Sequence, residues 1–166
     1  MRIQGVESLL RRGVHRMLLP DGKVLQVQIM ALPINVVLSV ARELPEPQPP
    51  LRVVGKRGDR NIEVEDNNPA HQAAKSQWIL ERAAAFAFHG LRGEPGITWD
   101  AHQGNGQHFD AAFYRKVLAE VTALGLSAEE LIRLAATIRE LGVVDEKQRE
   151  EASKDFLAPA AGRISG

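Results

Sequence analysis

The chain has 166 residues, of which 44% are hydrophobic and 25% charged, a composition typical of one globular domain with its own core. The 21 basic residues equal the 21 acidic ones, which argues against a nucleic-acid-binding protein, because such proteins usually carry net positive charge. The absence of cysteine excludes disulfides, thiol nucleophiles and cysteine-ligated zinc, and it fits the reducing cytoplasm.

The N-terminal sequence predicts neither export nor membrane insertion. It lacks a long apolar run followed by a small-residue cleavage site, so we expect no signal peptide. No window of about 18 uninterrupted apolar residues occurs in the chain. We therefore expect a soluble protein with no membrane partner.

The first third of the chain is predicted to contain most of the β structure. Residues 14–30 indicate a hairpin, because two apolar arms flank the turn sequence Pro20-Asp21-Gly22-Lys23. A short helix is expected over 34–43, and the proline-rich spacer 45–50 ends it in an extended conformation. The stretches 51–54 and 61–64 then predict a second β pair.

Asn68 and Pro69 open the strongest predicted helix, as N-cap and first helical residue. We expect it to end near His89, with Gly90 as its C′ residue. Residues 83–88 are apolar on every side, which indicates a helix that is central in the core or covered by a partner.

A long glycine-rich loop over 92–109 follows, which we expect Ile97 and Trp99 to pin to the body. Three further helices are predicted, over 110–124, from Ser127 to about Gly142, and over 145–157. Ser127 and Glu130 have the spacing of a capping box, and the helix that they open carries an apolar stripe made of Leu131, Leu134, Ala135 and Ile138.

These elements predict an α+β fold that is mainly α. It consists of an N-terminal β-hairpin and a short β pair, followed by a bundle of about four helices. We expect a single domain over 1–158, with a β-containing part at 14–64 and a helical part at 69–157. Residues 159–166 are predicted to be a flexible tail.

Polar clusters in the chain do not form a recognisable catalytic signature. His102 and His108, with Asp100 and Asp110 beside them, could ligate a divalent metal and so serve a metal-dependent hydrolase. The close histidine pair of a helical zinc site is missing, and a polar surface loop explains these residues equally.

Other polar residues have ordinary structural interpretations. We interpret His89 as a favourable residue for the end of its helix, and the pair Glu129-Glu130 as surface carboxylates. No serine lies in a G-x-S-x-G sequence. We therefore predict that the chain is not an enzyme and holds neither a metal nor a cofactor.

The order of features is more specific than any single motif. A hairpin with a Gly-containing turn leads through a short helix and the proline-rich spacer to a β pair. The sequence Glu65-Asp66-Asn67-Asn68-Pro69 then opens a helix with Trp78 in its first half. This order resembles that of the tail assembly chaperones of long-tailed bacteriophages. Later similarities are Leu126-Ser127-Ala128-Glu129-Glu130, Val143-Val144-Asp145-Glu146 and Phe156. The resemblance covers about half of the chain, and the loop at 92–109 departs from it.

The resemblance implies a non-enzymatic protein in the host cell cytoplasm. Such chaperones bind the tape measure protein, help recruit the tail tube protein to it, and are usually absent from the finished virion. Because aromatic side chains dominate interface energetics, we predict as partner contacts Trp78, Phe86, Phe88, Phe113 and Tyr114. The sequence leaves a homo-oligomer open.

The main alternative is a virion structural protein of a phage, such as a small tail or head–tail joining component. Its composition and parts would be similar, and its presence in purified particles would distinguish it. A regulatory or toxin–antitoxin binding module is a further alternative, which a host partner would indicate.

Overall fold

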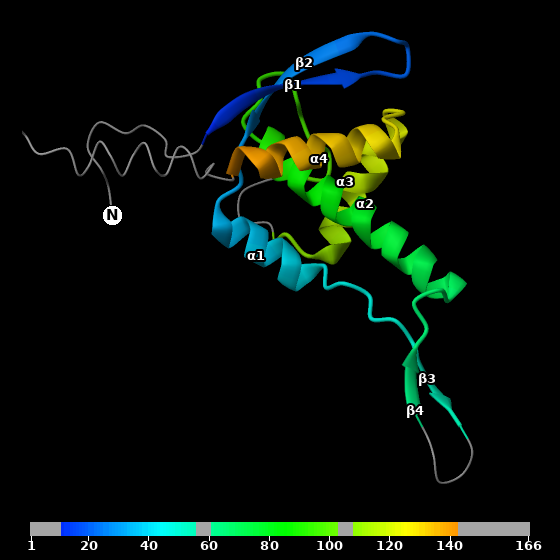
Figure 1. Ribbon diagram of the computed structural model, residues 1–166. Coiled ribbons are helices and arrows are strands. Elements are labelled where there is room, and N and C mark those ends of the chain that lie inside the picture. Colours follow the sequence, from blue (N-terminus) through cyan, green and yellow to red (C-terminus); the bar gives the residue numbers. More distant parts are fainter. Residues whose placement is uncertain (1–10, 56–60, 103–107, 143–166) are drawn as a thin grey trace, which may run out of the picture.

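The computed structural model describes residues 11–55, 61–102 and 108–142, and it confirms the predicted α+β, mainly α class (Figure 1). The predicted helix at 145–157 and the tail at 159–166 lie outside the described residues. The elements are β1 (Arg12–Leu18), β2 (Val24–Met30), α1 (Ile34–Glu43), β3 (Leu51–Val54), β4 (Asn61–Val64), α2 (Pro69–Leu91), α3 (Ala111–Ala123) and α4 (Ala128–Gly142).

Strands β1 and β2 form the predicted antiparallel hairpin. Gly22 has a φ of 80° in the turn, a conformation that glycine adopts without strain, and its amide donates to the carbonyl of Leu19 at 2.9 Å. The inward face of the hairpin buries His15, Met17, Val27 and Ile29, and it packs against α2 and α4.

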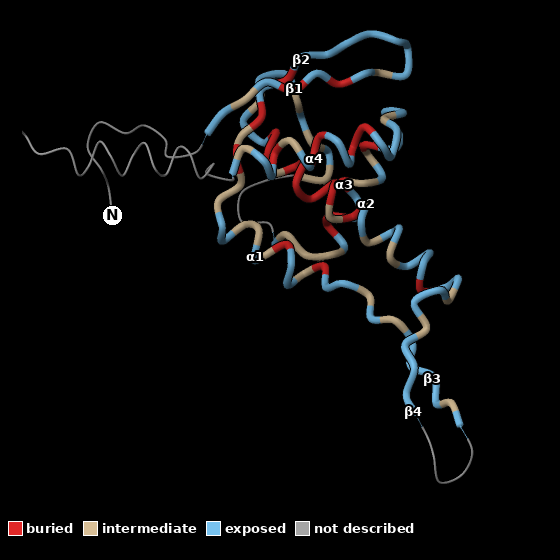
Figure 2. Tube along the Cα trace, in the orientation of Figure 1, coloured by how far each residue is buried: buried red, intermediate tan, exposed pale blue. Residues whose placement is uncertain are grey.

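Helix α2 is central, as one of the two interpretations of its apolar stretch predicted. Every residue from 83 to 88 is buried, and α2 contacts α1, α3, α4 and β2 (Figures 1 and 2). The predicted start is confirmed, because the Asn68 side chain accepts hydrogen bonds from the amides of Ala70 and His71. The buried Glu81 also accepts a hydrogen bond from Arg115, which joins α2 to α3.

The predicted end of α2 was wrong. The helix continues through Gly90 to Leu91, so Gly90 is a buried helical residue and not a C′ residue. A Cβ atom at Gly90 would lie 2.5 Å from Cδ1 and 2.9 Å from Cγ1 of Ile138. The glycine is therefore needed for the close approach of α4, which no local pattern in the sequence reveals.

Helices α3 and α4 begin and end as predicted. Asp110 caps α3 by accepting a hydrogen bond from the amide of Phe113 at 2.8 Å, and Gly125 ends it with a φ of 77°. The Ser127 hydroxyl caps α4 by accepting from the amide of Glu130 at 3.1 Å. The predicted stripe on α4 is buried in full: Leu131, Leu134, Ala135 and Ile138.

Strands β3 and β4 form a separate two-stranded antiparallel sheet, here called the ribbon. It projects from the body beyond the N-terminal end of α2, and exposed residues make up almost all of it (Figures 1 and 2). The proline-rich spacer 45–50, which has neither helix nor strand, connects it to α1.

Replacing Gly90 with alanine is expected to destabilise the fold. Overpacking a core costs about 1–3 kcal/mol, which exceeds the gain of up to about 1 kcal/mol from replacing a helical glycine with alanine. Urea unfolding of G90A should therefore show a net loss of free energy of unfolding.

The variant I138V is the matched control, because it removes the Cδ1 atom that a Cβ at Gly90 would meet. The double variant G90A/I138V should lose less stability than the sum of the two single losses. Strict additivity would contradict the proposed steric contact between α2 and α4.

Candidate partner-binding groove

An apolar cavity of about 670 Å³ lies between the hairpin, the 96–99 segment and the junction of α3 with α4, and we call it the groove. Ala87 and Leu91 of α2 contribute to its lining. Its other large apolar side chains include Met17, Leu25, Trp99, Leu124, Leu126 and Leu131. Leu124 is 77% exposed and Leu25 41% exposed, so parts of this lining already face solvent. A cavity of this size lies within the usual range of ligand pockets, about 300–1,000 Å³.

One wall of the groove is a loop that α3 holds in place. Glu120 of α3 accepts hydrogen bonds from the amides of Asp100, at 3.1 Å, and of Ala101. Trp99 packs its ring at the edge of Phe88, with 5.5 Å between the centroids. The prediction that Ile97 and Trp99 pin this loop to the body is confirmed, because both pack against the core.

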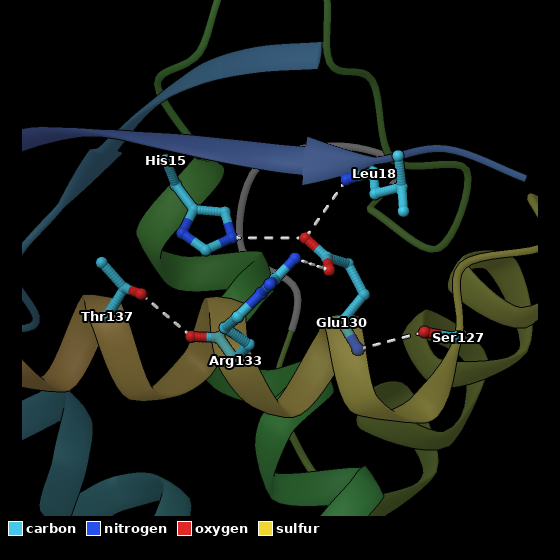
Figure 3. Close-up of polar contacts among 6 residues, drawn as sticks. All are labelled: His15, Leu18, Ser127, Glu130, Arg133 and Thr137. Carbon is cyan, nitrogen blue, oxygen red and sulfur yellow. Dashed lines mark hydrogen bonds and ion pairs between the residues drawn. The ribbon is translucent and has the colours of Figure 1, made fainter. Parts of the chain in front are cut away.

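The opposite wall is the hairpin, which a buried carboxylate holds onto α4 (Figure 3). Oε1 of Glu130 accepts a hydrogen bond from the amide of Leu18 at 3.3 Å and lies 3.6 Å from Nε2 of His15. The other carboxylate oxygen binds the guanidinium of Arg133. Glu130 therefore joins β1 of the hairpin, which forms this wall of the groove, to α4.

The interpretation of Glu130 as a surface carboxylate was wrong, because the residue is only 5% exposed. Its place in the first turn of α4 puts it under β1, which covers it. The sequence spacing with Ser127 suggested a capping box. The Ser127 cap is present, but the Glu130 side chain reaches across to Leu18 on the hairpin.

The charges at the groove are satisfied within the chain. Asp21 and Glu120 are the charged residues among the described residues that line it. Asp21 pairs with Lys23 at 2.7 Å, which holds the pKa of the Asp21 carboxyl below its ordinary value. Glu120 is used by the loop amides. The groove therefore offers apolar surface, and both charged residues that line it already have partners within the described chain.

Four of the five predicted contact aromatics are core residues in this structure. Phe86, Phe88, Phe113 and Tyr114 are each at most 3% exposed. Phe88 lies in an aromatic cluster, 4.9 Å from the Phe113 ring. The hypothesis that these side chains contact a partner stays a prediction, and their burial accounts for them as parts of the fold.

The fifth predicted contact, Trp78, is half-buried and holds the end of α1. Its indole Nε1 donates to the carbonyl of Leu44 at 2.9 Å. The guanidinium of Arg82 stacks on the same ring at 4.9 Å. Trp78 therefore lies apart from the groove lining, which contains none of the five residues predicted as partner contacts.

The histidines also have structural partners. His102 packs against Phe88 and Phe109, and no group of three potential metal ligands occurs within the described residues. His89 lies 3.0 Å from the Tyr114 hydroxyl. Burial, and secondarily the charge of Arg92, lowers the pKa of His89 to about 4.

His89 does lie in the last turn of α2, as predicted, but a lowered pKa favours the neutral ring, which does not interact with the helix dipole as a cation would. Burial raises the pKa of Tyr114 to about 12, so its hydroxyl keeps its proton. The hydroxyl can donate to the unprotonated Nε2 of His89, and this hydrogen bond joins α2 to α3.

Comparison with known proteins does not identify a relative for this arrangement. The chain matches no family model, no curated protein and no solved structure. In the part of the chain that the structure describes, no helix combines the length and the apolar character needed to cross a lipid bilayer. The geometry of the groove is thus the main structural guide to function.

Replacing Glu130 with alanine should destabilise the protein by about 1–3 kcal/mol, because it removes the charged acceptor of the part-buried hydrogen bond from the Leu18 amide. The neighbouring exposed Glu129 provides the control. E129A should change the free energy of unfolding by no more than about 0.5 kcal/mol. Equal losses for the two variants would contradict the role given to Glu130.

The His89 site predicts a pH dependence of stability. The unfolded chain protonates this ring near the ordinary pKa of 6.5, while the folded chain does so near 4. The free energy of unfolding should therefore fall as the pH drops from about 6.5 to 4, by up to about 3 kcal/mol.

The variant H89Q should remove this component from urea unfolding curves recorded between pH 7 and pH 4. H108Q, at an exposed position, should keep the pH dependence of the original chain. An H89Q curve parallel to the original one would show that His89 titrates normally in the fold.

Proposed function

We propose that this chain is a non-enzymatic tail assembly chaperone of a long-tailed bacteriophage, acting in the host cell cytoplasm. In this proposal it binds an apolar helical segment of the tape measure protein in the groove and helps recruit the tail tube protein. The observation that carries the proposal is the groove itself, an apolar cavity of about 670 Å³. The choice of partner comes from the resemblance in the order of sequence features.

An amphipathic helix is a suitable occupant because its apolar side chains recur on one face at i, i+3, i+4 and i+7. Such a stripe could enter the groove between Leu25 on the hairpin and Leu124 at the end of α3. Long assembly proteins expose stripes of this kind before they find their final neighbours. Covering them in an apolar groove is what a chaperone of this type needs to do.

The pairing of the two charged residues in the groove lining indicates which interaction would drive binding. Asp21 is paired with Lys23, and Glu120 accepts from loop amides. Binding would therefore depend on burial of apolar surface, at about 25 cal/mol per Å². Its affinity should change little with salt, because screening acts on charges and not on apolar contacts.

The ribbon favours a second candidate, a structural component of the virion. Projecting strands with apolar side chains, such as Val53 and Ile62, suit contacts between neighbouring subunits. The two candidates differ in one observation: a virion component is present in purified phage particles, and a chaperone is absent from them.

Co-expression with the tape measure protein of the same genome tests the chaperone proposal. Affinity capture followed by size-exclusion chromatography should give a soluble complex, while the tape measure protein alone should be insoluble. L124D places a charge on the exposed part of the groove lining and should abolish capture.

The control is L38D on α1, because Leu38 is also highly exposed, at 63%, and does not line the groove. It should leave capture unchanged. Equal loss in both variants, or a tape measure protein that is equally insoluble with and without this chain, would contradict the proposal.

A further inference from the structure

The hairpin ends in a turn whose hydrogen bonds all lie within the turn itself. This turn, residues 19–23, is here called the tip, and it follows the last residue pair of β1 and β2. The amide of Leu19 donates to the carbonyl of Lys23 at 2.8 Å, and the amide of Gly22 donates to the carbonyl of Leu19 at 2.9 Å. Asp21 pairs with Lys23 inside the same turn. Across the described residues, no hydrogen bond or ion pair joins the tip to the rest of the chain.

The tip touches the body where Pro20 meets Gly125, in the turn between α3 and α4. A Cβ atom at Gly125 would lie 2.7 Å from Cγ and 3.5 Å from Cβ of Pro20. Figure 1 shows the tip extending over this junction of α3 with α4. Pro20 lines the groove, and so do Leu124 and Leu126 on either side of Gly125. The contact therefore joins two walls of the groove.

The strands behind the tip are attached to the body along both edges. On β1, the amide of Leu18 donates to Glu130 of α4 at 3.3 Å. On β2, the amide of Gln28 donates to Oε2 of Glu94, in the loop after α2, at 3.1 Å. The inward side chains of both strands are buried as well, as Val27 illustrates at 2% exposure. The tip thus begins where the attachment of the hairpin ends.

We propose that the tip is a lid on the groove. In the free chain the lid is closed, with Pro20 resting on Gly125. It turns away from Gly125, about the ends of β1 and β2, when an apolar helical segment enters between Leu25 and Leu124. The inference rests on the proposed binding of such a segment in the groove, because the Pro20 contact lies at that entrance.

Two features make this movement inexpensive in free energy. The hydrogen bonds of the tip are internal and move with it, so opening leaves none of them unpaired. What opening breaks is a small apolar contact, and individual van der Waals contacts are weak. Leu19 and Pro20 also line the groove, so the displaced lid can still pack against the segment that has entered.

A disulfide can lock the lid, because the chain has no cysteine of its own. The Cβ atoms at positions 20 and 125 would be 3.5 Å apart, and disulfides join Cβ atoms about 3.5–4.5 Å apart. The oxidised double variant P20C/G125C should lose capture of the tape measure protein, and reduction should restore it. The single variant P20C, which cannot form this bond, should capture equally in both redox states. Equal capture by the oxidised and reduced double variant would overturn the proposal.

Binding of a neutral apolar dye, Nile red, reports on the lid without any protein partner. Oxidation of P20C/G125C should lower dye binding, and reduction should raise it again. G125A should also raise dye binding, because its Cβ would lie 2.7 Å from Pro20 and hold the tip away. G22A is the matched control: Gly22 has a φ of 80°, close to the 77° of Gly125, but a Cβ there meets nothing within 4 Å. It should leave dye binding unchanged.

The two readouts separate the lid from the proposed function. If neither the original chain nor the reduced double variant captures the tape measure protein, while dye binding still follows the disulfide, the proposed function is wrong and the lid stands. Dye binding that is the same in both redox states, and the same in G125A and G22A, would contradict the lid whatever the result of the capture experiment.

Discussion

The structure depends on the burial of helix α2 among the other helices and the first hairpin. Every residue of its stretch from Ala83 to Phe88 is buried, and these residues form the longest continuous part of the described core cluster. The small residues of this stretch allow neighbouring helices to approach closely. One close approach is at Gly90, where the absence of a side chain makes room for Ile138 of α4.

The groove lies where the hairpin, the loop after α2 and the junction of α3 with α4 pack around this helix. The hairpin lies over α4 and is fixed there by the buried Glu130 carboxylate. The loop after α2 is fixed from the other direction by Glu120. The apolar cavity lies between these two attachments, and each attachment holds one of its walls in place.

Much of the fold could be predicted because its signals are local. Asn68 followed by Pro69, Ser127 three residues before Glu130, and the Gly22 turn each determine a boundary within a few residues. The stretches 51–54 and 61–64 were also predicted as a β pair, which is present. Which side chains of this pair share a face depends on the register, which pairs Leu51 with Val64 and Val53 with Ile62.

The errors concern residues whose roles depend on distant parts of the chain. Gly90 has the same local sequence context as a helix-ending glycine, and only its contact with Ile138 distinguishes the two. The sequence around Glu130 is typical of a helix surface, and the residue is buried only because β1 covers it in the fold. The predicted aromatics were chosen for their chemistry, but packing places four of them in the core, and aliphatic residues from separate segments line the groove.

The most direct test of the groove as the binding site is amide hydrogen exchange of the chain, alone and in complex with the tape measure protein. The account predicts added protection in three separate segments, at 17–25, 96–101 and 121–131, which contribute most of the lining. Protection confined to the ribbon, or to the exposed face of α1, with these three segments unchanged, would contradict it.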